Sequence, residues 1–373
     1  MAGLLLKDVN KIYPGGEHAV KNCNLEVDSG DLLVLTGPEN CGKTSLLRMI
    51  AGLEEITSGE LVLDGKVATE ASLKERDVAM LFAGQSITPH LSVFDNLAYP
   101  LKIRKMPQEL IEQKVNAVAE ILGLTEYLPR KSKVLTGIQR QRVALGRIIV
   151  REPKVVLLDE PLAHLDANLR ALMKSEIAKL HARLDMIFIY ATHDAVEAMT
   201  MGTRIAVMKD GVIHQIDTPQ NIYDHPADFF VADFIGSPSM NFLGVTLTEE
   251  EGKNFIYLRG GKKIELGKSV TAKIKNISDY ENTDKNITLG IRPEDVRTDK
   301  AFLASAQTVF KAKVYRTESL GGKTLISCEI DEFNYVDALV PSASVNEGDE
   351  IELAFDTAHI HLFDTESDIS LKA

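Results

Sequence analysis

Apolar runs separated by turn residues and by helical patterns extend over the first two thirds of the chain. Each run has four or more apolar residues in succession, which is typical of a strand that is buried on both faces. Such strands are predicted over residues 31–36, 77–82, 155–160 and 186–193. A helix is predicted over residues 45–51, directly after the first of these strands. Strands that alternate with helices indicate an α/β fold.

The stretch from Ser86 to about Glu152 has a different pattern. Leu110, Val115 and Val118 lie near helical spacing within it, and no apolar run typical of a strand occurs there. We therefore predict a helical subdomain over residues 86–152. An ordinary run of surface helices is the alternative interpretation.

The two ends of the chain favour antiparallel strands. Residues 4–9 and 24–27 are predicted to form a small antiparallel layer. Residues 245–273 and 308–355 carry short apolar and polar alternations, which predict a small β barrel or sandwich. A chain of 373 residues that is 45% hydrophobic is long enough for two or three domains with cores of their own.

Composition excludes several classes of protein. The net charge of −12 argues against nucleic acid or an anionic membrane surface as the main partner. The three cysteines, Cys23, Cys41 and Cys328, are too few and too widely spaced for a disulfide framework or a zinc site, which indicates a reducing compartment. No apolar run approaches the roughly 20 residues needed to span a bilayer, and the N-terminus has no signal-peptide pattern. A role at the membrane would therefore require a partner.

A phosphate-binding loop is the strongest motif. The sequence Gly37-Pro38-Glu39-Asn40-Cys41-Gly42-Lys43-Thr44 fits G-x-x-x-x-G-K-[ST] and lies between a predicted strand and a predicted helix that begins near Ser45. In this context backbone N–H groups would surround the β- and γ-phosphates of a nucleoside triphosphate, Lys43 would contact them, and the Thr44 hydroxyl would bind Mg²⁺. A chance match in a strand-turn-helix unit is the alternative.

Other candidate residues follow the predicted strands. Asp159 could hold Mg²⁺, and Glu160 could orient or deprotonate an attacking water, because both carboxylates end an apolar strand. Solvated acids at a strand end are the alternative. His193 ends the next strand and is a candidate γ-phosphate contact or a structural residue. Tyr13, in a turn upstream of the loop, could stack on a nucleotide base or be a half-exposed turn tyrosine.

Together with the phosphate loop, several further motifs resemble the ATP-binding subunits of ABC importers, and in particular the sugar-importer group that includes the maltose ATPase. The resemblance covers nearly the whole chain. It is carried by residues 139–147, 157–161 and 192–194, and in the last third by residues 234–242, 290–295 and 361–364.

The resemblance implies a P-loop ABC ATPase domain over residues 1–235 and a β-rich, OB-like regulatory domain over residues 236–373. In this family two subunits enclose two ATP molecules, each held by one chain's phosphate loop and the other chain's L-S-G-G-Q signature. The signature positions here are Leu135, Thr136, Gly137, Ile138 and Gln139. Tyr13 is then expected on adenine, residues 37–45 on ATP, Glu160 as the catalytic base and His193 at the γ-phosphate.

The partners and location implied by the resemblance are those of an importer. We expect membrane-spanning importer subunits, a second ATP-binding subunit in a homodimer or heterodimer, and an extracytoplasmic solute-binding protein that acts indirectly. No nucleic acid partner is expected. The chain would lie peripherally at the cytoplasmic face of the membrane, with ATP and Mg²⁺ as cofactors and a carbohydrate as the expected cargo. Its C-terminal domain would regulate the transporter or only support dimerisation.

Several positions depart from the family pattern. Glu39 and Asn40 replace small residues in the phosphate loop, and a carboxylate about 4 Å from a phosphate costs roughly 1 to 4 kcal/mol. Ala83 stands where the family has a glutamine that contacts Mg²⁺, with Gln85 as the nearest substitute. Ile138 places a branched side chain where backbone must approach phosphate. Ala163 stands where the family usually has a serine, in the loop that communicates between the two ATP sites, and is a milder change. These departures leave open a subunit that hydrolyses ATP slowly or not at all beside a standard partner.

Overall fold

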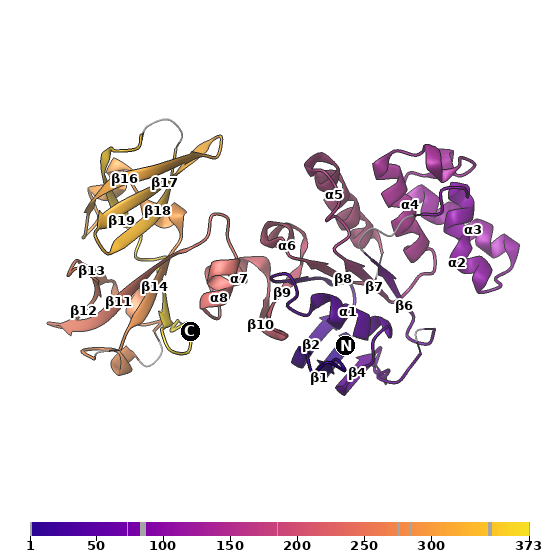
Figure 1. Ribbon diagram of the computed structural model, residues 1–373, viewed down its shortest axis with the longest axis horizontal. Coiled ribbons are helices and arrows are strands. Elements are labelled where there is room, and N and C mark those ends of the chain that lie inside the picture. Colours follow the sequence, from indigo (N-terminus) through magenta and orange to yellow (C-terminus); the bar gives the residue numbers. More distant parts are fainter. Residues whose placement is uncertain are drawn as a thin grey trace. The chain divides into compact units, whose positions relative to one another are not determined.

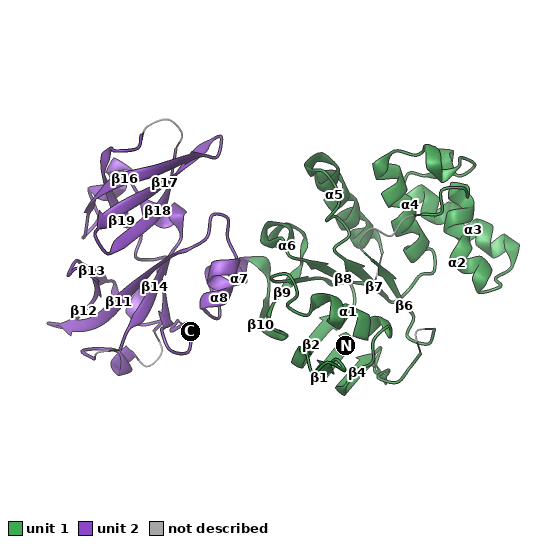
Figure 2. Cartoon of the chain, viewed as in Figure 1, with its two compact units in different colours: residues 1–219 green, residues 220–373 purple. Residues whose placement is uncertain are grey.

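Two units make up the chain, residues 1–219 and residues 220–373 (Figure 2). The computed structural model describes residues 2–72, 74–82, 87–184, 186–274, 277–283, 285–341 and 345–372. The contacts divide the chain earlier than residue 235, so the expected boundary of the ATPase domain at that residue stays a prediction. Within the described residues no helix has the length and apolar composition to cross a membrane.

A six-stranded sheet forms the centre of the first unit (Figure 1). Its order is β10, β9, β3, β8, β7, β6, and all neighbouring pairs are parallel except β9 and β10. Every residue of β3, β7 and β8 is buried, as their continuous apolar runs predict. The strands are β3 (Leu32–Thr36), β6 (Val78–Leu81), β7 (Val155–Asp159), β8 (Ile187–Thr192), β9 (Arg204–Lys209) and β10 (Val212–Asp217). The predicted α/β fold is confirmed.

A second sheet in this unit is antiparallel along its four strands, in the order β2, β1, β4, β5. These are β1 (Ala2–Ile12), β2 (His18–Asp28), β4 (Ser58–Leu63) and β5 (Lys66–Val67). Side chains of β1 and β2 share one core with α1 (Lys43–Ala51) and with strands of the central sheet. Helix α1, which follows the phosphate loop, is therefore held in place by packing against both sheets.

The predicted helical subdomain is confirmed between β6 and β7. It contains α2 (Val93–Ile103), α3 (Gln108–Ile121), the short helices η1 (Thr125–Tyr127) and η2 (Ser132–Val134), and α4 (Gly137–Ile149). Val115 and Val118 are buried as their spacing predicts, whereas Leu110 is 44% exposed. A Cβ added to Gly146 would lie 2.5 Å from Leu97 Cδ2, so α2 and α4 pack too closely for a larger residue. Helices α5 (Ala167–Arg183) and α6 (Ala195–Met201) complete the unit.

The second unit contains two five-stranded sheets in which every pairing is antiparallel. One has the order β13, β12, β11, β14, β20, and the other β15, β19, β16, β17, β18. The first set is β11 (Asn241–Glu250), β12 (Lys253–Leu258), β13 (Lys263–Leu266), β14 (Ile287–Ile291) and β20 (His361–Asp364). The second is β15 (Val296–Arg297), β16 (Phe310–Ser319), β17 (Lys323–Asp331), β18 (Asn334–Pro341) and β19 (Glu350–Phe355).

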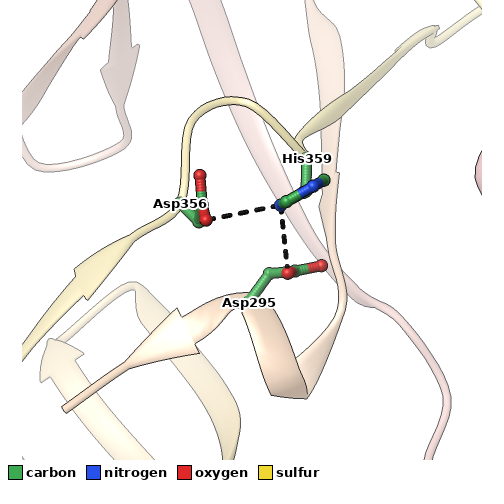
Figure 3. Close-up of side chains that lie close together, drawn as sticks. All are labelled: Asp295, Asp356 and His359. Carbon is green, nitrogen blue, oxygen red and sulfur yellow. Dashed lines mark ion pairs between the residues drawn. The ribbon is translucent and has the colours of Figure 1, made fainter. Parts of the chain in front are cut away.

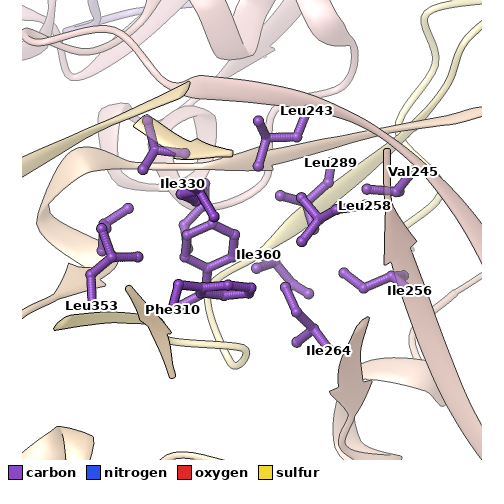
Figure 4. Close-up of a cluster of buried hydrophobic side chains, with 14 of the residues drawn as sticks. Leu243, Val245, Ile256, Leu258, Ile264, Leu289, Phe310, Ile330, Leu353 and Ile360 are labelled. Carbon is purple, nitrogen blue, oxygen red and sulfur yellow. The ribbon is translucent and has the colours of Figure 1, made fainter. Parts of the chain in front are cut away.

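Both sheets contribute to one apolar core, with Leu243 and Leu289 from the first sheet and Phe310 and Leu353 from the second (Figure 4). This confirms the small antiparallel β domain, a barrel or sandwich, that the alternating pattern predicts. Short helices connect the strands: α7 (Pro219–Asp224), α8 (Phe229–Phe234), α9 (Lys268–Thr271), η3 (Ile277–Asp279), η4 (Pro293–Asp295) and α10 (Lys300–Leu303).

Candidate nucleotide site

The phosphate loop connects β3 to α1 and depends on two glycines. Gly37 has a φ of 151° and Gly42 a φ of 106°. A Cβ on Gly37 would lie 1.9 Å from the Met208 carbonyl oxygen, and one on Gly42 would lie 2.2 Å from the Ala19 carbonyl oxygen. Both positions therefore require glycine for backbone angle and for space. Asn40 has a φ of 59°, a left-handed conformation that asparagine tolerates better than most residues.

The side chain of Lys43 folds back onto the loop. Its residue is only 5% exposed, and Nζ donates hydrogen bonds to the carbonyl oxygens of Gly37 at 2.8 Å and Pro38 at 2.7 Å. An ammonium buried in this way needs such acceptors, because an unpaired buried charge is costly. The oxygens of a bound phosphate are acceptors of the same kind and carry negative charge, so the ammonium is already directed at the space that the loop encloses.

Thr44 and Asp159 bring two oxygen ligands together. The Thr44 hydroxyl donates a hydrogen bond to Asp159 Oδ1 at 3.0 Å. Burial raises the pKa of Asp159, the hydrogen bond from Thr44 partly opposes that rise, and the neighbouring Glu160 adds to it. A hydroxyl and a carboxylate beside the phosphate loop are the hard oxygen ligands that Mg²⁺ prefers. The two residues therefore fit a magnesium ion, and Gln85, the third candidate ligand, lies outside the described residues, as does Ala83.

Glu160 follows directly after β7 and lies against His193, which follows β8. The backbone N–H of Glu160 donates to the Ala191 carbonyl oxygen at 3.1 Å, which holds the residue at a φ of 44°. Its Oε1 is 3.1 Å from His193 Nδ1. Because β7 and β8 are parallel neighbours, their carboxyl ends place these two side chains together. The sequence motifs alone did not show that the two residues touch.

A cavity of about 340 Å³ lies over the loop. Residues 39–45 line it together with Glu160, which unites the two motifs in one site. Glu17 and Ala19 also line it, from the segment before and at the start of β2. Sequence reasoning missed both residues. The requirement for glycine at position 42 signals a close backbone neighbour there, although it does not identify Ala19.

Tyr13 lies beside the loop helix without lining this cavity. Its hydroxyl is 3.0 Å from Ser45 Oγ, and Lys11 Nζ is 4.8 Å from the centre of its ring. The residue is partly buried. Stacking of Tyr13 on adenine stays a prediction, and the contact with Ser45 shows only that the ring is held close to the start of α1.

The signature positions form the start of α4. Thr136 is the N-cap, and its hydroxyl accepts a hydrogen bond from Gln139 N–H while Gln139 Oε1 accepts one from Thr136 N–H at 3.0 Å. This capping box satisfies two N–H groups at the start of the helix. Leu135 is buried, and Ile138 is partly buried next to Gly137. Gln141 Nε2 donates to the Pro161 carbonyl oxygen at 3.0 Å and so joins α4 to the segment that follows Glu160.

Sequence comparisons place these features in a known family. A profile of ABC transporter ATPase domains matches residues 20–163, one of the MalK OB fold domain matches residues 236–296, and one of the TOBE domain matches residues 289–363. The oligosaccharides import ATP-binding protein MsmX of Bacillus subtilis is 42% identical over 377 residues, with all of both chains covered. The trehalose/maltose import ATP-binding protein MalK of Thermococcus litoralis is 43% identical over 373 residues, with 98% of each chain covered.

Solved structures agree on the fold of the first unit. The structure of cbiO1 from Clostridium perfringens, part of the ABC transporter complex cbiONQ, matches with a TM-score of 0.56 at 24% identity and covers 60% of this chain and 91% of that one. The ADP conformation of MJ1267, an ATP-binding cassette of an ABC transporter, matches with a TM-score of 0.54 and covers 61% of this chain and 96% of that one. With relatives above 40% identity along its whole length, the chain belongs to the ATPase subunits of ABC transporters.

Proposed function

We propose that this chain powers a carbohydrate importer by hydrolysing Mg-ATP at the interface of a dimer of ATP-binding subunits. One observation carries the proposal: Lys43, Thr44 and Glu160 line one cavity, and Asp159 accepts a hydrogen bond from the Thr44 hydroxyl. The cargo class rests on the relatives, whose names describe import of oligosaccharides and of trehalose and maltose. The particular sugar is a property of other subunits.

Each of these residues has a separate role in hydrolysis. Lys43 would exchange its loop carbonyls for phosphate oxygens, and Thr44 with Asp159 would hold the magnesium ion. When bound, Mg²⁺ supplies positive charge that stabilises the transferring phosphoryl group. Glu160 accepts a hydrogen bond from the attacking water and orients it, and His193, held 3.1 Å from Glu160, contacts the γ-phosphate. Tyr13 supports the adenine from its place beside Ser45.

The second half of each site comes from another ATP-binding subunit. Residues 135–139 cap and begin α4. The capping bonds use the N–H groups of Thr136 and Gln139, so those of Gly137 and Ile138 are the donors left for the γ-phosphate held by the partner. Membrane-spanning importer subunits convert closure of the dimer into transport, and a solute-binding protein delivers cargo on the other side. We place the chain peripherally at the cytoplasmic face. Residues 1–235 form the ATPase domain and residues 236–373 the regulatory domain, which is supported by the OB profile that begins at residue 236.

A subunit with slowed hydrolysis is a second candidate, and one observation favours it. Glu39 is exposed and lines the phosphate-loop cavity together with Glu17 and Glu160. Three carboxylates around a site for a triphosphate oppose binding of that anion unless cations compensate them. The rate of hydrolysis, rather than membership of the family, separates the two candidates.

Purification of the native complex tests the proposal. We expect polytopic membrane subunits to copurify with this chain, and ATP turnover that rises with the solute-binding protein and its sugar. If a partner ATPase accounts for all turnover in the assembled transporter and this chain's site contributes none above background, the slowed subunit is the correct candidate. Purification of the chain without any membrane protein would overturn the transport function.

A further inference from the structure

The second unit contains a cavity of about 430 Å³ that shares no residue with the nucleotide site. Its lining includes Asp224 at the end of α7, Lys273 after α9, Arg292 after β14, His361 in β20 and Lys372 near the C-terminus. These residues come from five separate segments. The volume is within the range of pockets that hold small molecules.

Two lysines give one side of this cavity its charge. Lys372 pairs its backbone with Ile274 in an isolated bridge, which brings the C-terminal segment beside Lys273. Burial lowers the pKa of Lys372 to about 8, and the positive charge of Lys273 contributes to that shift. In the part of the chain that the structure describes, neither ammonium makes an ion pair with a carboxylate. Two like charges held close together, neither of them ion-paired with a carboxylate of the described residues, favour an anionic ligand between them.

Arg292 extends the positive region into the unit. It is 2% exposed, its two terminal nitrogens donate at 2.8 Å to the carbonyl oxygens of Ile235 and Tyr223, and its guanidinium lies 3.6 Å from the centre of the Tyr223 ring. These partners are neutral, and the carboxylates of Glu294, Asp295 and Asp224 lie close enough to stabilise the charge of the guanidinium. Burial lowers the pKa of His361, and the positive charges of Lys372 and Arg292 lower it further.

The acidic residues near the cavity already have partners in ion pairs or hydrogen bonds. Asp295 lines the cavity, and with Asp356 and His359 it forms a cluster whose side chains point toward one another (Figure 3). His359 Nδ1 lies 3.3 Å from Asp295 Oδ1 and 3.3 Å from Asp356 Oδ2. Asp224 accepts a hydrogen bond from Gln220 Nε2 at 2.7 Å. These carboxylates keep acceptor positions for hydroxyl groups but do not neutralise the two lysines.

His361 adds a neutral polar group. It is 6% exposed, and burial lowers its pKa to about 3, so the imidazole is uncharged near neutral pH. Among the described residues nothing forms a hydrogen bond with the imidazole. A neutral imidazole has one donor and one acceptor, which is the combination that a hydroxyl group complements.

We propose that this cavity binds a small organic phosphate that also carries hydroxyl groups, with the phosphate between Lys273 and Lys372 and the hydroxyls toward His361 and Asp224. A phosphate group offers three oxygens and about two negative charges, and so matches two ammonium groups better than a single carboxylate does. The site would give the second unit a ligand of its own, whatever the cargo of the transporter.

Calorimetric titration of the full chain with glucose 6-phosphate, glucose and inorganic phosphate tests the assignment. We expect glucose 6-phosphate to bind, inorganic phosphate to bind at least tenfold more weakly, and glucose not to bind. Lys372→Gln and Lys273→Gln should each weaken binding of glucose 6-phosphate at least tenfold. Lys323→Gln, which removes the same charge from an exposed lysine on β17, should leave it unchanged. Thermal unfolding of each variant checks that the second unit is intact, and Lys273 is exposed, so its variant should fold.

The phosphate loop is a competing site, and Lys43→Ala separates the two. Binding that survives in Lys43→Ala and weakens in the two cavity variants supports the proposal. Binding that is lost in Lys43→Ala and kept in the cavity variants would assign the phosphate to the nucleotide site and overturn it. The absence of any binding, or equal binding of glucose and glucose 6-phosphate, would also overturn it. None of these outcomes depends on ATP turnover, so the proposal is tested separately from the transport function.

Discussion

The Thr44 hydroxyl donates a hydrogen bond to Asp159 Oδ1 at 3.0 Å and so joins the first turn of α1 to the end of β7. The two residues are far apart in the sequence, and each belongs to a different motif. Their contact shows that the phosphate loop and the acidic end of β7 meet within one chain. The hydrogen bond places two oxygen atoms side by side, and both would be available to the magnesium ion that we propose for this site.

Removal of the loop lysine should weaken ATP binding strongly. Lys43→Ala deletes a charged donor aimed at phosphate oxygens, and loss of such a contact costs roughly 2 kcal/mol or more, or about 30-fold in affinity. Titration with a fluorescent ATP analogue measures it. Lys66→Ala, at an exposed position on β5, is the matched control and should bind normally. Unchanged ATP affinity in Lys43→Ala would exclude the assigned role.

Neutralising Asp159 should stabilise the chain without nucleotide. Burial raises the pKa of this carboxyl, so its ionised form opposes folding above that pKa, and the cost is relieved as the pH falls through it. Asp159→Asn removes the charge while it keeps an acceptor for the Thr44 hydroxyl. We expect a higher Tm at pH 7, by roughly 2 to 4 °C for each kcal/mol gained, and a smaller difference from the wild type in acid.

The same variant should lose the stabilisation that Mg-ATP gives. If Asp159 binds the metal, adding Mg²⁺ to ATP should raise the Tm of the wild type more than that of Asp159→Asn. Equal responses to Mg²⁺ in both proteins would remove Asp159 from the metal site, whatever its effect on intrinsic stability.

Glu160→Gln should stop hydrolysis and retain ATP. The amide keeps the size and polarity of the side chain but cannot accept a proton, and loss of a general base typically costs 10²- to 10⁴-fold in rate. Size-exclusion chromatography with ATP should then show a stable dimer, while phosphate release should be close to background. Glu70→Gln, at an exposed position outside the site, should turn over like the wild type. Undiminished turnover in Glu160→Gln would contradict the proposed base.

The order of motifs along the chain predicts much of this site, because parallel strands bring their carboxyl ends to one edge of the sheet. That rule places Gly37, Glu160 and His193 together once β3, β7 and β8 are recognised as apolar runs. It does not predict the hydrogen bond between Glu160 and His193, which depends on the positive φ of Glu160. Nor does it predict Glu17 at the cavity, because that residue reaches the loop from the antiparallel sheet, whose packing no motif records.

The cavity in the second unit was beyond sequence reasoning for a related reason. Lys273 and Lys372 are nearly a hundred residues apart, and each looks like a solvated surface lysine in the sequence. The isolated bridge between Ile274 and Lys372 brings them together, and such a single pairing has no periodic pattern in the sequence. The alternation of apolar and polar residues along the chain does not predict a non-local pairing of this kind.

The last prediction concerns pairing between subunits. In a homodimer each ATP would meet Glu39 and Ala83 from one chain and Ile138 from the other, so all departures would fall on both sites. Beside a subunit of standard sequence they separate, and one site then has only Ile138. We therefore predict a heterodimer with unequal sites. Hydrolysis should be slower at the site that uses this chain's signature, because the branched side chain of Ile138 keeps the backbone N–H donors away from the phosphate.

Restoring Ile138→Gly and Ala83→Gln one at a time in the assembled transporter measures the effect. Ile138 is the second residue of α4, so glycine there should cost about 0.5 kcal/mol of helix stability, while the Thr136 and Gln139 capping bonds remain. A rise in turnover despite a lower Tm would then report on the chemistry of the site and not on folding. A purified transporter with two copies of this chain, full ATPase activity and no gain from either reversion would contradict the prediction, because the Ile138 backbone and Gln85 would already serve the site as they stand.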